Sequence, residues 1–336
     1  MNTLTKNIPL NVLDLVSISE GQTTREALQQ ALESAQLIDK LGFKRLWFAE
    51  HHNSINLASM ATSNLIGLAA QVTERIRIGS GGIMLPNHAP LQVAESFGTL
   101  AQLFPDRIDL GLGRAPGTDA QTAQLLTRSG SDPQSFANSI FDLIGWFSDK
   151  GSAHSVPVTS NVGTGTNIPI WVLGSSMNGA SIAGQLGLPY SIATHFTPDD
   201  YREKIDVYRS AFKTSAPTAQ IEEPYVMAGI NVLVAPTDEE AERLWTTTQQ
   251  MLQDMQTGRQ RLLQPPVHSE QLGTEQERAM IESMFSIKAV GSPETVQKKL
   301  QQFAESTGAD ELIVVTYTYD PEDRKRSMNM LAELWF

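Results

Sequence analysis

The strongest constraint in this 336-residue chain is a repeated alternation of short apolar runs with amphipathic stretches of helical period. Several apolar runs are hydrophobic at almost every position, which is typical of parallel strands covered by helices. Eight strand–helix units favour a closed (β/α)8 TIM barrel, with an open doubly wound sheet as the alternative. We expect residues 1–336 to form one such domain. The predicted strands are 8–17, 45–50, 76–85, 108–113, 168–173, 190–193, 225–235 and 311–317.

Residues 237–286 interrupt this alternation after the predicted seventh strand. They carry only helical patterns, and a polar stretch with Pro265-Pro266 lies in their middle. Because the segments that follow barrel strands gather on the catalytic face, we interpret this insertion as a candidate lid. A surface helical hairpin without a role is the alternative.

Composition excludes several kinds of site and partner. The chain has no cysteine, which rules out disulfides, thiolate nucleophiles and cysteine-bound metals. The net charge is -12, from 25 basic and 37 acidic residues, and the absence of a basic run argues against nucleic acid. No run approaches the roughly 18 apolar residues of a membrane span, and Met1–Leu10 lacks the apolar stretch of a signal peptide. We expect a cytoplasmic protein that binds neither nucleic acid nor membrane.

Polar residues at the carboxyl ends of the predicted strands form the candidate site, because barrel enzymes build their active sites there. Adjacent strand residues point to opposite faces, so His51 and His52 cannot both bind one metal ion, and we predict no metal site. The strand-end residues are Glu50-His51-His52 after the second strand, Arg114 after the fourth, Gly174-Ser175-Ser176 after the fifth and His195 after the sixth.

Glycine-containing segments indicate how a ligand would be held. Backbone N–H groups and two hydroxyls at Gly174-Ser175-Ser176, where a helix starts, would form a phosphate cradle; N-capping by one serine is the alternative. Arg114 on the neighbouring strand favours phosphate. Gly81-Gly82 lies inside the third strand, where glycine is costly, and indicates an unusual backbone or a ligand lying against it. Gly111–Gly117 is not a dinucleotide fingerprint, because proline stands at position 116 where that motif needs glycine.

Four segments resemble the bacterial luciferase-like flavin monooxygenases, specifically their single-subunit oxidoreductase branch. The segments are 46–53 (LWFAEHHN), 74–119, 169–176 (PIWVLGSS) and 290–300 (VGSPETVQKKL), in family order. The resemblance implies a barrel that binds flavin mononucleotide (FMN). It also implies that the insertion at 237–286 corresponds to a mobile loop of the relatives.

The resemblance further implies roles for single residues. His51 matches the family's active-site histidine, flanked by Glu50 and His52. Gly81-Gly82 matches the place where relatives hold a non-proline cis peptide beside the flavin ring. Arg114 and Ser175-Ser176 match the phosphate-binding region, and we expect Gly174 and His195 to line the cofactor site with them. Light emission is not implied, because Gly113 stands where the light-emitting luciferase subunit has a reactive cysteine, and Gly174 where it has an acidic residue.

The implied activity is FMN-dependent monooxygenation. Reduced FMN from a separate NAD(P)H-dependent flavin reductase would react with O2 and oxidise a small organic substrate, with His51 bonding or shuttling a proton. The family also implies a homodimer, for which the apolar helices after the second and third strands are candidate interfaces. The alternatives are F420-dependent hydride transfer within the same superfamily and a non-catalytic flavin-binding protein. A metal-dependent hydrolase is disfavoured, because the H-x-H spacing is missing.

Overall fold

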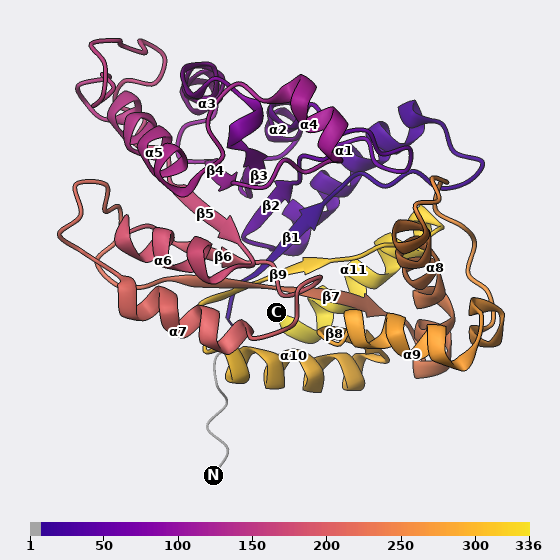
Figure 1. Ribbon diagram of the computed structural model, residues 1–336. Coiled ribbons are helices and arrows are strands. Elements are labelled where there is room, and N and C mark those ends of the chain that lie inside the picture. The colour runs from indigo at the N-terminus through magenta and orange to yellow at the C-terminus, as the bar shows by residue number, and fades with distance from the viewer. Residues whose placement is uncertain (1–7) are drawn as a thin grey trace.

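The computed structural model describes residues 8–336 and forms a closed barrel of eight parallel strands with helices around it (Figure 1). Neighbouring strands pair in chain order from β1 to β7, and β9 pairs with both β7 and β1, which closes the ring. The predicted (β/α)8 fold is therefore confirmed. Most of the N-terminal segment considered as a targeting signal lies outside the described residues. The barrel strands are β1 (Leu10–Asp14), β2 (Arg45–Phe48), β3 (Arg77–Met84), β4 (Ile108–Gly113), β5 (Ile170–Gly174), β6 (Tyr190–Ile192), β7 (Val226–Val234) and β9 (Glu311–Val315).

Helices cover the outside of the barrel, and the first of them has clear start and stop signals in the sequence. The first starts at a capping box between Thr23 and Glu26 and stops at Gly42, whose φ of 91° suits glycine. In the part of the chain that the structure describes, no helix is long and apolar enough to cross a membrane. The helices are α1 (Thr24–Leu41), α2 (Thr62–Gln71), α3 (Pro90–Leu103), α4 (Ala120–Leu126), α5 (Pro133–Phe147), α6 (Met177–Gln185), α7 (Tyr201–Ala211), α10 (Pro293–Thr307) and α11 (Pro321–Trp335).

The amino-terminal end of the barrel interior is filled by charged and aromatic side chains. The guanidinium of Arg45 forms ion pairs with Asp109 and Glu311, whose carboxylates are fully buried. Above them, Trp47 and Trp171 meet edge to face with ring centroids 5.4 Å apart. This packing leaves the opposite end, where the strands finish, as the place for a site.

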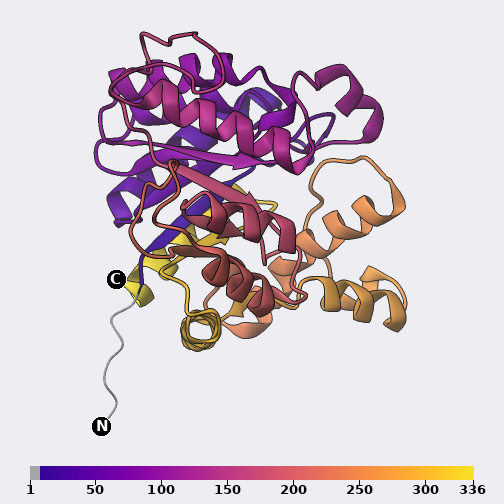
Figure 2. The same ribbon diagram turned by 60° about the vertical axis from the view of Figure 1, so that its left-hand side comes forward.

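The insertion at 237–286 is helical, and a short strand follows it before the next barrel helix. This part of the chain comprises α8 (Asp238–Thr257), the short 3-10 helix η2 (Ser269–Leu272), α9 (Glu275–Met284) and β8 (Lys288–Gly291). β8 extends β7 by pairing with Asn231–Val234, beyond most of the register that β7 shares with β9. These elements have a hydrophobic core of their own and stand at the edge of the molecule (Figures 1 and 2). Within residues 237–286 the elements are all helical, as predicted, and β8 follows just beyond that range, where no strand was predicted.

The segment between α8 and η2 is tied to the loop that follows β1. The backbone of Leu263 accepts a hydrogen bond from Glu20 N at 2.9 Å and donates one to Ile18 O at 2.9 Å. On its other side, the hydroxyl of Thr247 on α8 donates to Gln264 O at 2.9 Å. The segment thus lies at the carboxyl side of the barrel and is held there by specific bonds.

Candidate active site

Glu50 and His51 follow β2 and continue its alternation across the barrel wall. Trp47 and Ala49 pack in the interior cluster, whereas Leu46 and Phe48 pack in the outer core beneath the helices. His51 therefore continues the inward-facing row. Glu50 points outward, where its carboxylate accepts a hydrogen bond from Met84 N at 3.0 Å.

The carboxylate of Glu50 is almost completely buried, with 1% of the side chain exposed, and is surrounded by donors. His52 Nε2 lies 2.7 Å from Oε1, His88 Nε2 lies 2.9 Å from Oε2, and Asn87 Nδ2 donates to Oε1 at 3.2 Å. Burial alone would raise the pKa of Glu50. The hydrogen bonds from His52 and His88, together with the charge of His88, outweigh burial and lower that pKa to about 2. Glu50 is consequently ionised at neutral pH.

His52 is anchored at both its backbone and its ring. Its backbone N–H donates to Gly117 O at 3.1 Å, and its carbonyl accepts from the Thr118 hydroxyl at 3.0 Å. Together with the Glu50 contacts, these bonds fix the chain on both sides of His51. Asn87 and His88 lie within segment 74–119, which carries the family resemblance, but neither was predicted as a site residue. The signal that could have identified them is their position, as two polar side chains between an apolar strand and a helix.

His51 and His195 come from strands on opposite sides of the ring, β2 and β6. The Nδ1 atoms of both rings are buried and have no hydrogen-bond partner within residues 8–336. Burial lowers the pKa of His51, and burial together with the charge of His51 lowers the pKa of His195 to about 4. The ring of His195 lies against Gly229, where an added Cβ would be 2.4 Å from Nδ1. Both imidazole rings are therefore uncharged at neutral pH, and each has an Nδ1 atom without a hydrogen-bond partner in the described residues.

The peptide bond between Gly81 and Gly82 is cis, although neither residue is proline. A Cβ at Gly81 would lie 2.5 Å from Leu13 Cδ1, and one at Gly82 would lie 2.7 Å from Gly111 O. Backbone packing therefore requires glycine at position 82, whereas a side chain at 81 would displace the end of Leu13. The unusual backbone predicted from the sequence is present, and Glu50 N donates to the Gly82 carbonyl at 3.4 Å.

Arg114 and the segment Gly174-Ser175-Ser176 lie at the ends of β4 and β5. Arg114 is partly exposed and makes no ion pair or hydrogen bond with any described residue, so its charge is free to meet a ligand. Ser176 is the N-cap of α6 and accepts a hydrogen bond from Gly179 N at 3.2 Å. The N-capping alternative thus applies to this serine. Ser175 has no side-chain hydrogen bond in the described part of the chain.

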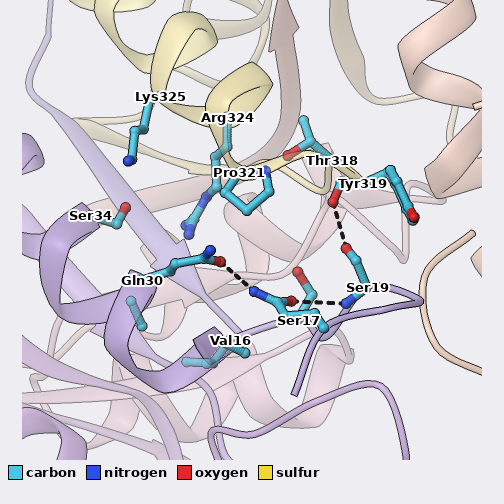
Figure 3. A pocket seen from close by; sticks show the side chains of 13 residues that line it. Val16, Ser17, Ser19, Gln30, Ser34, Thr318, Tyr319, Pro321, Arg324 and Lys325 are labelled. Carbon is cyan, nitrogen blue, oxygen red and sulfur yellow. Dashed lines mark hydrogen bonds between the residues drawn. The ribbon is translucent and has the colours of Figure 1, made fainter. Parts of the chain in front are cut away.

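Two cavities lie outside the barrel wall. A small one between α1 and α11, shown in Figure 3, has a volume of about 40 Å³, which suits a few water molecules. Arg324, which lines it, is already paired with Asp14 at 2.8 Å. The second, of about 310 Å³, lies between α2 and α3 and is bordered by His88; we call it the outer cavity. Neither cavity is lined by His51. Within residues 8–336, no group of three or more potential ligands is placed to hold a metal ion.

The whole chain has relatives among known proteins. The family model for luciferase-like monooxygenases matches residues 9–311. The chain belongs to this family. It is 41% identical over 332 residues to the luciferase-like monooxygenase of Escherichia coli (strain K12), covering 98% of this chain and 97% of that protein. The crystal structure of apo-MsnO8 superposes with a TM-score of 0.87 at 36% identity and covers 98% of both chains.

More distant structures share the fold with different cofactors. One is the oxygenating constituent of 3,6-diketocamphane monooxygenase from Pseudomonas putida in complex with FMN, with a TM-score of 0.74, 18% identity and 97% coverage of both chains. Another is an F420-dependent secondary alcohol dehydrogenase, with a TM-score of 0.68, 15% identity and 98% coverage of both chains. The protein is thus an oxidoreductase of the luciferase-like monooxygenase family, whose fold accommodates FMN or F420.

Proposed function

We propose that this protein is an FMN-dependent monooxygenase that uses reduced flavin and O2 to oxidise a small organic substrate. The observation that carries the proposal is the unpaired guanidinium of Arg114 at the end of β4, two strands along the barrel from His51 at the end of β2, with Gly81-Gly82 in the strand between them. The FMN complex of a protein with the same fold supports this choice of cofactor.

The residues at the strand ends fit an FMN molecule. Arg114 and Ser175, with the amino terminus of α6, would hold the phosphate, because a free cation, a free hydroxyl and helix N–H groups favour a dianion. Gly81-Gly82 and His195 would border the ring system, with Gly174 nearby. When bound, reduced FMN would activate O2 so that one oxygen atom enters the substrate and the other leaves as water. We infer that a separate NAD(P)H-dependent reductase supplies the reduced flavin.

His51 is the residue that we assign to proton handling. Its buried Nδ1 lacks a partner, and burial lowers its pKa, so the ring is neutral and free to accept a proton at neutral pH. Glu50 and His52 act behind it by fixing the backbone on either side. The segment tied to the loop after β1 would help to keep water from the reacting atoms.

Oxygen uptake in the presence of FMN, NAD(P)H and a flavin reductase tests this function over a panel of small organic compounds. We expect uptake to rise with substrate, to yield an oxygenated product and to fall roughly 100-fold in His51→Ala. Flavin binding without substrate-stimulated uptake would favour a flavin-binding protein. Hydride transfer to F420 without oxygen would favour the second candidate, which the shared fold with the F420-dependent alcohol dehydrogenase supports.

We also propose that the protein is a cytoplasmic homodimer. Leu68 on α2 and Leu103 on α3 are 53% and 66% exposed, which leaves apolar surface on the two helices expected to form the interface. The outer cavity lies near the opposite ends of these helices, around Ser63 and Gln92. Sedimentation of the wild type and of Leu68→Glu would detect the dimer and its loss.

A further inference from the structure

The buried Glu50 carboxylate is paired with two histidines and with no lysine or arginine of the described chain. The ionisable side chains that contact it are both histidines, His52 from the same strand end and His88 from the turn before α3. Asn87 and the Met84 backbone supply only neutral donors. A buried anion is stabilised most by a positive charge nearby, so the two imidazoles are the groups able to provide it.

Both imidazoles use the same ring nitrogen toward the carboxylate. His52 Nε2 lies 2.7 Å from Oε1, and His88 Nε2 lies 3.0 Å from that atom and 2.9 Å from Oε2. An ionised carboxylate requires a proton on each Nε2. The proton that charges either ring therefore sits on its Nδ1, which faces away from Glu50.

The two histidine side chains differ in exposure. The His88 side chain is 36% exposed and borders the outer cavity, where Glu95, Gln92, Ser63 and Ser96 are its polar neighbours on α2 and α3. The His52 side chain is 19% exposed, and its backbone is bonded to the loop after Arg114. The His88 ring is thus the more exposed of the two.

We propose that His88 is a positioning residue that acts through Glu50, sharing with His52 the single counter-charge of this carboxylate. One buried anion compensates one imidazolium but not two, since a second positive charge would be repelled. When one of the two rings gains a proton at Nδ1, the other releases its own Nδ1 proton to water. One proton is bound and one is lost, and both Nε2–H bonds to Glu50 persist throughout. The link between this exchange and turnover rests on the proposed function.

A titration of the apoprotein tests the exchange without flavin or substrate. Imidazole nitrogen signals of the full-length protein would be followed by NMR as a function of pH in the wild type and in His88→Gln. Glutamine keeps a donor for Glu50 but cannot carry charge. We expect the titration midpoint of His52 to rise by about 1 pH unit, as expected when a nearby competing charge is removed. His268→Gln, whose ring lies in the insertion away from Glu50, is the control and should leave that midpoint in place.

The reciprocal variant His52→Gln distinguishes coupled titration from a local rearrangement around His88. By linkage, His52→Gln must move the midpoint of His88 upward by the same amount. Unchanged midpoints in both variants would overturn the proposal, whatever cofactor the protein binds. In turnover, His88→Gln should displace the pH profile of kcat toward alkaline pH by a similar interval. A role limited to hydrogen bonding predicts a profile equal to that of the wild type.

Discussion

Glu50 and His51 are adjacent in the chain, yet one side chain points outward from the barrel wall and the other faces its interior. The outward carboxylate joins the end of β2 to the turn after β3, through Met84 and His88. The inward ring therefore stands on a backbone that is held from behind. Glu50 therefore fixes the end of the strand, and the neighbouring His51 is left to handle protons.

Replacing Glu50 by glutamine should destabilise the protein in a pH-dependent way. At pH 7 we expect a loss of roughly 1–3 kcal/mol in the free energy of unfolding, because the buried donors around Glu50 lose a charged acceptor. The pKa of Glu50 is depressed from 4.5 to about 2, so its contribution is fully present above about pH 4.5. It disappears as the pH falls through 2. The difference between wild type and variant, measured by urea denaturation, should therefore shrink over this interval.

The exposed Glu203 on α7 provides the control for this experiment. Glu203→Gln should follow the wild-type curve at every pH. A constant difference between Glu50→Gln and wild type down to pH 2 would contradict an ionised, hydrogen-bonded carboxylate at position 50.

Replacing Arg114 by alanine should weaken FMN binding selectively. A lost charge-assisted contact is worth roughly 1.5–3 kcal/mol, or about 10- to 100-fold in affinity. Riboflavin, which lacks the phosphate, should bind the variant as it binds the wild type. Fluorescence titration with both ligands measures this, with the exposed Arg25→Ala as control. Equal losses of affinity for FMN and for riboflavin would show that Arg114 does not bind the phosphate.

Gly229→Ala should displace the His195 ring, because the new Cβ would lie 2.4 Å from its Nδ1. We expect a cost of roughly 1–3 kcal/mol in unfolding free energy and weaker flavin binding. Removing the ring removes the clash, so Gly229→Ala should cost little more in a His195→Ala background. A double-mutant cycle by denaturation measures this, and simple additivity would show that the two residues do not meet.

Thr247→Val should loosen the segment between α8 and η2. The variant keeps the shape of the side chain but loses the bond to Gln264 O, worth roughly 0.5–1.5 kcal/mol. Backbone amides in residues 259–268 should exchange about 2- to 10-fold faster in hydrogen–deuterium exchange. Thr257→Val, whose hydroxyl bonds within its own helix to Gln253 O, is the matched control. Equal exchange in both variants would mean that this contact does not hold the segment.

The sequence predicted the barrel because apolar runs report strands wherever burial is continuous. β8 was not predicted, because Lys288–Gly291 is only four residues long and adjoins a helix start. The cis Gly81-Gly82 was predictable, since two glycines inside a strand are costly and the family resemblance marks the place.

The environment of Glu50 was not predictable in the same way. Its partners His88 and Asn87 stand 38 and 37 residues further along the chain. Likewise, the contact of His195 with Gly229 joins two neighbouring strands whose register only the folded barrel defines. Such contacts depend on where the turns bring side chains after the strands have paired, and one sequence carries no local signal for that.

Equilibrium titration of the protein with reduced FMN and with F420, under anaerobic conditions, tests the central claim most directly. The proposed function predicts saturable binding of reduced FMN at a 1:1 ratio per chain, with F420 binding at least 10-fold weaker. Tight binding of F420 without measurable binding of FMN would contradict it and would assign the site to hydride transfer.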